Sequence, residues 1–178
     1  MKAAENAVPR SASAASDEAT PSSVPWHLRP ALPEDTPALQ RHCLADRTLE
    51  DVERLLRHSQ KTALNRRGLG LVAELPDGTP IGFGQLTLWP NTAEISDLIV
   101  GKRWRGQGVG SAIIRKLIEA AREMAMDRVE IGVALRNYDT LRLYRRLGFD
   151  YGRTIDLDLG EGPEPVMYME MALTPQRP

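Results

Sequence analysis

Apolar positions along this chain change their spacing several times, and each change marks the border of a predicted strand or helix. Between Ala93 and Ala125 the segment AEISDLIV is followed by the glycine-rich GKRWRGQG and then by VGSAIIRKLIEAAREMA. In the last segment apolar side chains recur every three or four positions, which predicts an amphipathic helix with one face on a sheet. These side chains are Val109, Ala112, Ile113, Leu117, Ala120, Ala121 and Met124. A strand, a tight turn and a helix are therefore expected in direct succession.

The chain up to this turn contains patterns for two helices and four strands. The predicted elements are a strand at 26–30, a helix that starts at residues 34–36, a helix at 49–65, and strands at 70–75, 80–88 and 93–100. The sequence Pro76-Asp77-Gly78-Thr79 separates two of these strands, and its proline and glycine favour a chain reversal. We therefore expect 70–75 and 80–88 to form an antiparallel hairpin, with 93–100 beside it.

Beyond the long helix the same patterns predict a strand, a helix and two more strands. The ranges are 128–135, 138–147, 151–159 and 166–173, with Asn137 as the N-cap and Gly148 as the C-cap of the helix. Two strands joined by a crossover helix should pair in parallel. The order predicts a single α/β domain at 26–174. Its mixed, mostly antiparallel sheet of about seven strands should have helices on both faces and one central parallel strand-helix-strand unit.

Residues 1–25 are rich in Ala, Ser and Pro and contain no apolar run. Such a segment cannot bury enough surface to offset the cost of ordering it, so a disordered tail is predicted. A signal peptide needs an apolar stretch of at least about seven residues, and a membrane span needs about 20. Neither is found, and a cytoplasmic protein without a membrane partner is expected.

Composition narrows the function further. The chain has 178 residues, of which 42% are hydrophobic, and a formal net charge of −1. This supports a sizeable core and gives no general attraction to nucleic acid. Cys43 is the only cysteine, and the three histidines all lie in the N-terminal third. An internal disulfide is excluded, and a metal site is not expected.

Three glycines alternate between the central strand and the long helix: Gly106, Gly108 and Gly110. They allow a sharp turn and leave backbone N–H groups uncovered. The first-turn amides of the helix lack partners at the positive end of its dipole, so the turn can bind a phosphate, with Arg103 and Arg105 nearby. The spacing fits neither G-x-G-x-x-G nor the P-loop, which requires lysine where this chain has Gln107.

The loop reads Arg105-x-x-Gly108-x-Gly110, and in this context it resembles the coenzyme loop of the GCN5-related N-acetyltransferases (GNAT). A second segment, Asn137-Tyr138-Asp139-Thr140-Leu141-Arg142-Leu143-Tyr144 with Gly148-Phe149, is similar to the Asn-x-x-Ala-x-x-Leu-Tyr and Gly-Phe patterns of that family. It departs from them at Thr140, where alanine is usual. The resemblance covers about residues 28–173 and implies the GNAT fold, an acyltransferase activity, acetyl-coenzyme A as co-substrate and no metal.

The resemblance also implies where the coenzyme binds. In the family the loop wraps the pyrophosphate, the preceding strand offers backbone groups to pantetheine, and the asparagine contacts the pantetheine arm or adjacent backbone. Carried over residue by residue, the binding set is Leu98, Ile99, Val100, Arg105, Gly106, Gln107, Gly108, Val109, Gly110, Ser111, Asn137 and Tyr144. Leu98 and Val100 would supply the backbone groups, while Ile99 would point into the core. For Asn137, helix capping alone is the competing interpretation, and both roles are compatible.

Direct acetyl transfer to a primary amine in a ternary complex needs a donor for the departing thiolate and an acceptor for the amine proton. Tyr144 resembles the family's tyrosine that faces the coenzyme sulfur; the alternative is a purely structural buried aromatic. Glu94 lies where some protein-lysine acetyltransferases of the family carry a catalytic glutamate. Asp97, Glu130 and water are the competing proton acceptors. Strand alternation predicts that Glu94, Ser96, Leu98 and Val100 share one face and that Asp97 lies on the other.

The acceptor amine binds to regions whose sequence varies within the family. In the family it contacts the first two helices, their connection and the loop between the last two strands. Here that loop carries Asp156, Asp158, Glu161 and Glu164, which would suit a cationic amine on a small molecule or a protein. The alternative function is a sensor or regulatory module that binds acetyl-coenzyme A without catalysis. A homodimer is left open.

Overall fold

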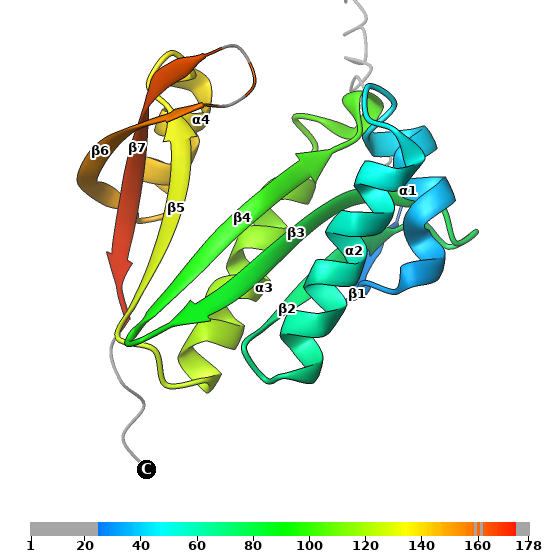
Figure 1. The fold of residues 1–178 in the computed structure, drawn as a ribbon, viewed down its shortest axis with the longest axis horizontal. Helices are drawn as coiled ribbons and strands as arrows, with labels where there is room; N and C mark the ends of the chain where they lie inside the picture. Colours follow the sequence, from blue (N-terminus) through cyan, green and yellow to red (C-terminus); the bar gives the residue numbers. More distant parts are fainter. Residues whose placement is uncertain (1–24, 159, 161, 174–178) are drawn as a thin grey trace, which may run out of the picture.

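The computed structural model describes residues 25–158, 160 and 162–173 (Figure 1). Its elements are β1 (His27–Pro30), the 3-10 turn η1 (Pro33–Asp35), α1 (Thr36–Cys43), α2 (Leu49–Leu64), β2 (Gly68–Glu74), β3 (Pro80–Trp89), β4 (Thr92–Val100), η2 (Lys102–Trp104), α3 (Val109–Glu123), β5 (Arg128–Ala134), α4 (Tyr138–Arg146), β6 (Asp150–Asp158) and β7 (Pro163–Ala172). Every predicted helix and strand is present, with ends that differ by a few residues. The predicted tail, except for Pro25, lies outside the described residues.

The strands form one sheet in the order β1-β2-β3-β4-β5-β7-β6. β4 and β5, which α3 connects, pair in parallel, and the other neighbouring strands run antiparallel. The predicted hairpin is formed by β2 and β3, and its turn is closed by a bond from Leu75 N–H to Thr79 O at 2.9 Å. The prediction of a mixed, mostly antiparallel sheet around one parallel strand-helix-strand unit is therefore confirmed.

Helices cover both faces of this sheet, as predicted. α1 and α2 pack on one face, where Leu39, Val52 and Leu56 meet Val72 and Phe83 in one core cluster. α3 belongs to the larger cluster on the opposite face, together with side chains of α4. Figure 1 shows α2 in front of the strands and α3 behind them. Within the described residues, no helix is long and apolar enough to cross a membrane.

Gly84 of β3 allows α3 to lie unusually close to the sheet. A Cβ at this position would lie 2.8 Å from Cγ2 of Ile113 and 3.2 Å from Cδ1 of Leu98. A larger residue would therefore push the helix away from the strand or distort it. Because Ile113 lies in the first part of α3, this contact also positions the glycine-rich turn that precedes the helix.

β4 and β5 pair only along their first halves. The parallel register runs from Thr92, opposite Arg128, to Ile95, opposite Ile131, and no described residue beyond them continues it. Past this point β4 stays bonded to β3, and β5 stays bonded to β7. Figure 1 shows the two strands diverging as a V. The divergence leaves backbone groups of β4 without strand partners on the side that faces β5.

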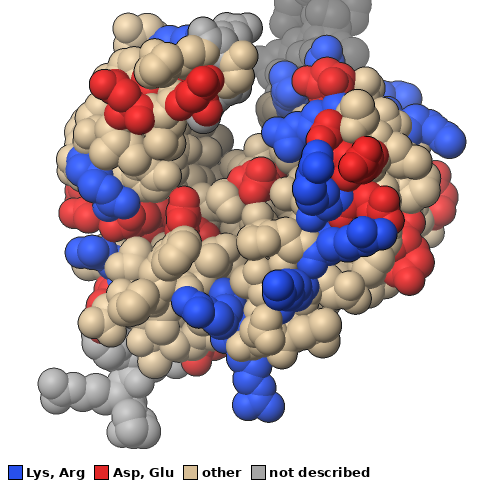
Figure 2. Space-filling view, in the orientation of Figure 1, with Lys and Arg blue, Asp and Glu red and all other residues tan. Residues whose placement is uncertain are grey.

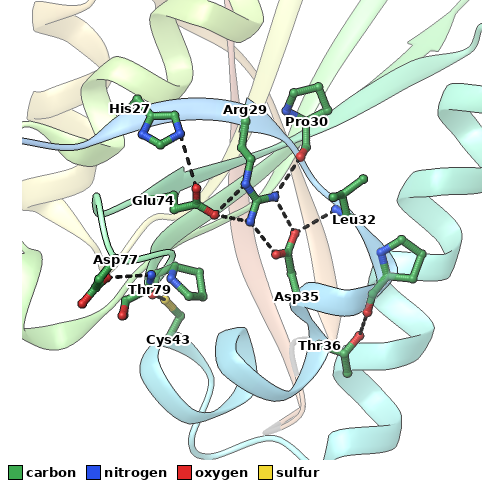
Figure 3. Close-up of polar contacts among 12 residues, drawn as sticks. His27, Arg29, Pro30, Leu32, Asp35, Thr36, Cys43, Glu74, Asp77 and Thr79 are labelled. Atoms are coloured by element: carbon green, nitrogen blue, oxygen red, sulfur yellow. Dashed lines mark hydrogen bonds and ion pairs between the residues drawn. The ribbon is translucent and has the colours of Figure 1, made fainter.

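Arg29 fastens β1 to the start of the helical layer (Figure 3). Its guanidinium lies between Asp35 of η1 and Glu74 of β2, with Nη1 to Asp35 Oδ2 at 2.9 Å and Nε to Glu74 Oε2 at 2.6 Å. Hydrogen bonding to Asp35 is the largest cause that raises the pKa of Arg29 above its ordinary value. The guanidinium is therefore charged throughout the usual pH range and holds α1, and with it α2, against the sheet.

Candidate active site

The glycine-rich turn forms an open anion site at the start of α3. Gly106 and Gly108 have φ angles of 74° and 83°, a left-handed conformation that favours glycine, and Gly108 is the N-cap of α3. The first helical bond runs from Ala112 N–H to Gly108 O at 3.0 Å. The amides of Val109, Gly110 and Ser111 precede that bond, so they have no acceptor within the helix. A Cβ at Gly106 or Gly108 would meet no atom within 4 Å, which shows that the outer side of the turn is open.

The polar side chains of the turn are partly used to shape it. Nε of Arg105 donates to the carbonyl of Val100 at 3.2 Å, so this side chain folds toward the end of β4. Nε2 of Gln107 donates to the carbonyl of Arg103 at 3.0 Å. The Gln107 side chain therefore closes the turn, whereas its backbone stays beside the open surface. Both Arg105 and Gln107 are exposed, so they can move toward a bound anion.

α4 places Tyr144 and Asn137 at different depths. The Asn137 side chain caps the helix, with its Oδ1 accepting from Thr140 N–H at 3.2 Å, as the sequence predicts. Tyr144 is 4% exposed and packs against Phe149 with ring centroids 6.0 Å apart. Burial raises the pKa of Tyr144 to about 12. None of the described residues forms a hydrogen bond with the Tyr144 hydroxyl. Every fully buried side-chain oxygen among the described residues has a hydrogen-bond partner, so this hydroxyl is not fully buried and must contact solvent.

Glu94 of β4 is oriented by two neutral donors. Nε1 of Trp89 donates to Glu94 Oε2 at 2.9 Å, and the hydroxyl of Tyr168, on β7, donates to Oε1 at 3.5 Å. Burial, followed by the charge of Glu94, raises the pKa of Tyr168. The sequence analysis missed both donors. Trp89 lies at the turn before β4, only five residues from Glu94, so the sequence could have indicated this donor. Tyr168 lies 74 residues from Glu94, and no local pattern predicts that contact.

Asp97 corrects one prediction about β4. Its φ angle is 50°, and the register between β3 and β4 shifts beside it, between Phe83 and Gln85. This bulge interrupts the alternation of side chains, so Asp97 lines the same cleft as Glu94 and accepts from Gln85 Nε2 at 2.7 Å. The prediction that Asp97 faces elsewhere is therefore wrong.

Past the bulge, the rest of β4 is distributed differently from the prediction as well. Leu98 and Val100 pack in the α3-side core cluster, while Glu94 and Ser96 line the cleft beside α2. The expected common face of these four residues is thus split. Ile99 packs into the core cluster beneath α1 and α2, as the resemblance implied.

Glu130, the third candidate base, lies beside Glu94 in the parallel register but is held by two arginines. Its Oε1 is 3.3 Å from Nε of Arg128, and its Oε2 is 2.8 Å from Nη1 of Arg153. The Glu130 side chain is only 6% exposed. Both carboxylate oxygens of Glu130 are therefore engaged by arginines, and neither is directed toward the cleft that Glu94 lines.

A cleft of about 1290 Å³ lies between α2 and the strands β3 and β4, and Glu94 and Asp97 line it. Figure 2 shows the hollow between the α2 side and the β5 to β7 side of the molecule. The loop after β6 reaches the cleft through Gly160, but its described carboxylates do not line it. Asp158 accepts from Gly160 N–H at 2.8 Å, and Glu164 pairs with Arg136 at 2.9 Å. Glu161 lies outside the described residues.

Metal ligands do not gather in the described ranges. No group of three or more His, Cys, Asp or Glu side chains there could hold a metal ion. Cys43 lies beside the carbonyl of Pro80, and burial raises the pKa of its thiol to about 11. The thiol is therefore protonated at neutral pH and poorly suited to act as a nucleophile.

The splayed β4 and β5, the glycine-rich turn between them and the buried tyrosine of α4 define an acetyltransferase class of fold. The family model described as Acetyltransferase (GNAT) family matches residues 30–149, and the chain belongs to this family. The resemblance that the Arg105 loop and the Asn137 segment carry is thereby confirmed.

Curated relatives match part of the chain. It is 35% identical over 81 residues to Uncharacterized N-acetyltransferase MJ1207 of Methanocaldococcus jannaschii, a match that covers 42% of this chain and 36% of the relative. It is 27% identical over 96 residues to L-amino acid N-acetyltransferase AaaT of Escherichia coli, with 51% and 59% covered. These matches therefore span from about a third to three fifths of the relatives' length.

Solved structures share the fold. A putative acetyltransferase, yncA from Salmonella typhimurium, has been solved with its cofactor acetyl-coenzyme A. It superimposes with a TM-score of 0.68 and 23% identity, covering 84% of this chain and 94% of that one. The likeness shows a common architecture over nearly the whole described part of the chain.

Proposed function

We propose that this protein transfers the acetyl group of acetyl-coenzyme A to a primary amine, by direct attack within a ternary complex. The observation that carries the proposal is the divergence of β4 and β5 after Ile95 and Ile131. It opens the sheet between the anion site before α3 and the cleft that contains Glu94. A coenzyme can then enter from the glycine-rich turn, while an amine approaches through the cleft.

Coenzyme binding would use the amides at the start of α3 and backbone groups of β4 that have no strand partner on the β5 side. The pyrophosphate fits the uncovered turn from Gly106 to Ser111, where free amides and the helix dipole favour an anion, and Arg105 adds a full charge. The pantetheine amides would pair with backbone groups of Leu98 and Val100 along the open edge of β4, where the Val100 carbonyl is released when Arg105, which donates to it here, turns toward the pyrophosphate. The Asn137 amide can contact the same arm while its oxygen caps α4.

The amine must lose a proton before it attacks. An amine with a pKa near 10.4 is neutral only about once in a few thousand molecules at pH 7, which corresponds to roughly 4 to 5 kcal/mol. Glu94 is the proposed proton acceptor, because neutral donors orient its carboxylate and it lines the cleft. Asp97 lies in the same cleft and is the nearest competitor, ahead of Glu130 with its two arginines.

Tyr144 is the proposed donor for the departing thiolate. As the amine nitrogen bonds to the thioester carbonyl carbon, the carbon–sulfur bond breaks and the sulfur takes the phenolic proton. The attacking nitrogen then loses its extra proton, which returns through solvent to the tyrosinate, so that an N-acetyl amine and a free thiol are formed. A pKa of about 12 keeps this phenol protonated at neutral pH, so the proton is available when the thiolate forms. Since no residue in the described part of the chain bonds the hydroxyl, it is free to face the sulfur.

The acceptor class is supported by relatives rather than by any bound molecule. AaaT is named for acetylating L-amino acids, which are primary amines. The cleft is large enough for a small amine or for the end of a longer one, and its carboxylates can hold an ammonium group. A primary amine on a small molecule or a protein is therefore the proposed partner.

Thiol release provides the direct test. The full chain is incubated with acetyl-coenzyme A and a panel of amines, free coenzyme thiol is measured with a chromogenic disulfide, and acetylated products are identified by mass spectrometry. Amine-dependent release is the expected result. If acetyl-coenzyme A raises the melting temperature but no amine accelerates release, the chain is a coenzyme-binding sensor rather than an enzyme.

A further inference from the structure

The cleft beside Glu94 carries opposite charges on its two sides. Cations predominate on the α2 side: Arg47 before the helix, Arg54 and Lys61 on it, and Arg67 after it, with the carboxylate of Asp51 among them. Carboxylates of β4, Glu94 and Asp97, line the sheet side. Figure 2 shows Lys and Arg side chains gathered along α2 next to the hollow. A ligand in this space is therefore exposed to positive charge on one side and to negative charge on the other.

The two sets of charges do not neutralise each other. Arg54 pairs with Asp51 of its own helix. Glu94 and Asp97 instead accept hydrogen bonds from uncharged side chains. Among the described residues, neither Arg47 nor Lys61 has a carboxylate partner. Unmatched cations and unmatched carboxylates thus share one cleft without contact between them.

Helix geometry directs part of this cationic side into the cleft. Arg54, His58 and Lys61 follow one another at spacings of four and three residues, which places them on one face of α2. Arg57 lies on the same helix but does not line the cleft, and it pairs with Glu53. The cations at the cleft are therefore a feature of one helix face rather than of a uniformly basic surface.

We propose that the acetylated amine also carries an anionic group, a carboxylate or a phosphate, which Arg47 and Lys61 bind while Glu94 and Asp97 hold the ammonium end. The proposal rests on the proposed function and names its substrate class. A zwitterionic acceptor complements both sides of the cleft at once. A polyamine would place a second cation against the α2 side, where like charges repel.

Paired substrates that differ in one charge test this directly. Initial rates of thiol release are compared for L-leucine and L-leucinamide, and for O-phosphoethanolamine and ethanolamine, with spermidine as a third arm. The anionic member of at least one pair should have a kcat/KM roughly tenfold higher or more. The pair that shows the preference identifies the anion as carboxylate or phosphate. Loss of the anionic group lowers the pKa of the amine, so more of the amine is unprotonated and ready to attack. This effect by itself would favour the substrate without the anion.

Substitutions on the α2 side assign the preference to residues. Arg47→Gln and Lys61→Gln should each lower kcat/KM for the anionic substrate roughly three- to thirtyfold and leave the neutral partner within about twofold. Lys61→Glu should reverse the preference. Arg57→Gln removes an α2 cation outside the cleft and is the matched control, which should change neither substrate.

Binding of a product pair separates this inference from the proposed function. The coenzyme A complex is titrated calorimetrically with N-acetyl-L-leucine and N-acetyl-L-leucinamide, and with N-acetylated phosphoethanolamine and ethanolamine. If no amine supports turnover, the proposed function fails, yet tighter binding of an anionic product that Lys61→Gln abolishes would still support the anion site. Equal binding of neutral and anionic products, better turnover of neutral amines or spermidine, or equal effects of the variants on both members of a pair would overturn the inference.

Discussion

The indole N–H of Trp89 donates a hydrogen bond to Glu94 at 2.9 Å, although the tryptophan is 51% exposed. Tyr168 reaches the other carboxylate oxygen from β7. An ionised carboxylate has about four acceptor sites, so these two donors orient Glu94 without saturating it. A bound ammonium can still donate to the same group.

Replacement of Glu94 by Gln should lower kcat/KM at neutral pH by roughly a hundredfold, because the amide keeps the shape but cannot accept a proton. Part of the rate should return at high pH, where an amine of pKa near 10 becomes neutral without help. The measurement is a pH–rate profile from thiol release, recorded with two amines of different pKa. A variant with the wild-type rate and profile would make Glu94 a bystander, and Asp97→Asn, measured in parallel, would then test the competing base.

Trp89→Phe removes the hydrogen-bond donor and keeps an aromatic ring. Because Trp89 is exposed, the free energy of unfolding should change by less than about 1 kcal/mol. We expect kcat to fall a few fold as Glu94 loses its orientation, with the affinity for coenzyme unchanged. Rates and coenzyme-induced melting shifts of the same preparation separate these effects; an unchanged kcat would show that Tyr168 alone suffices to position the carboxylate.

The coenzyme site predicts a thermal-shift result. Acetyl-coenzyme A should raise the melting temperature, and both Arg105→Glu and Gly108→Val should remove most of that shift, by charge repulsion and by covering the amides respectively. Gly78 has a φ of 85° and open space around it, much like Gly108, but lies in the β2–β3 turn. Gly78→Val therefore carries similar backbone strain and should retain the shift. No shift in the wild type at millimolar coenzyme would refute the proposed coenzyme site.

Much of the fold could be predicted because its determinants are local. The change from two-residue to three- and four-residue apolar spacing locates the helices and strands, and the glycine spacing before Val109 indicates the anion site. The order of elements is enough to predict the parallel pairing of β4 and β5. These features depend on residues close together in the chain.

The details of the site depended on longer-range contacts. Simple alternation failed at Asp97, because a left-handed residue in β4 shifts the register by one and no proline or glycine marks it. The contact between Glu94 and Tyr168 joins residues 74 positions apart and requires the full strand order. Composition alone predicted that the acidic loop suits a cationic amine, but Asp158 accepts from a backbone amide and Glu164 pairs with Arg136.

Tyr144→Phe should keep the fold and the coenzyme affinity and lower kcat by roughly ten- to a thousandfold, the range for loss of an acid or of one transition-state donor. The ring contact with Phe149 needs no hydroxyl, so packing should survive. Single-turnover kinetics would isolate the chemical step, with Tyr138→Phe, an exposed tyrosine on the same helix, as control. An unchanged chemical rate would assign Tyr144 a structural role.

The same substitution should alter stability at alkaline pH. Burial raises the pKa of Tyr144 to about 12, so between about pH 10 and 12 the unfolded chain has lost this proton while the folded chain retains it. The unfolded state then binds fewer protons, and the free energy of unfolding must fall as pH rises through this window. The decline due to Tyr144 amounts to at most about 2 to 3 kcal/mol and should be absent in Tyr144→Phe.

Cys43, with a pKa of about 11, should cause a separate decline in the free energy of unfolding that starts nearer pH 9 in both proteins. Urea denaturation at intervals from pH 8 to 11.5 measures the difference, and parallel curves for wild type and Tyr144→Phe would contradict the burial of the phenol.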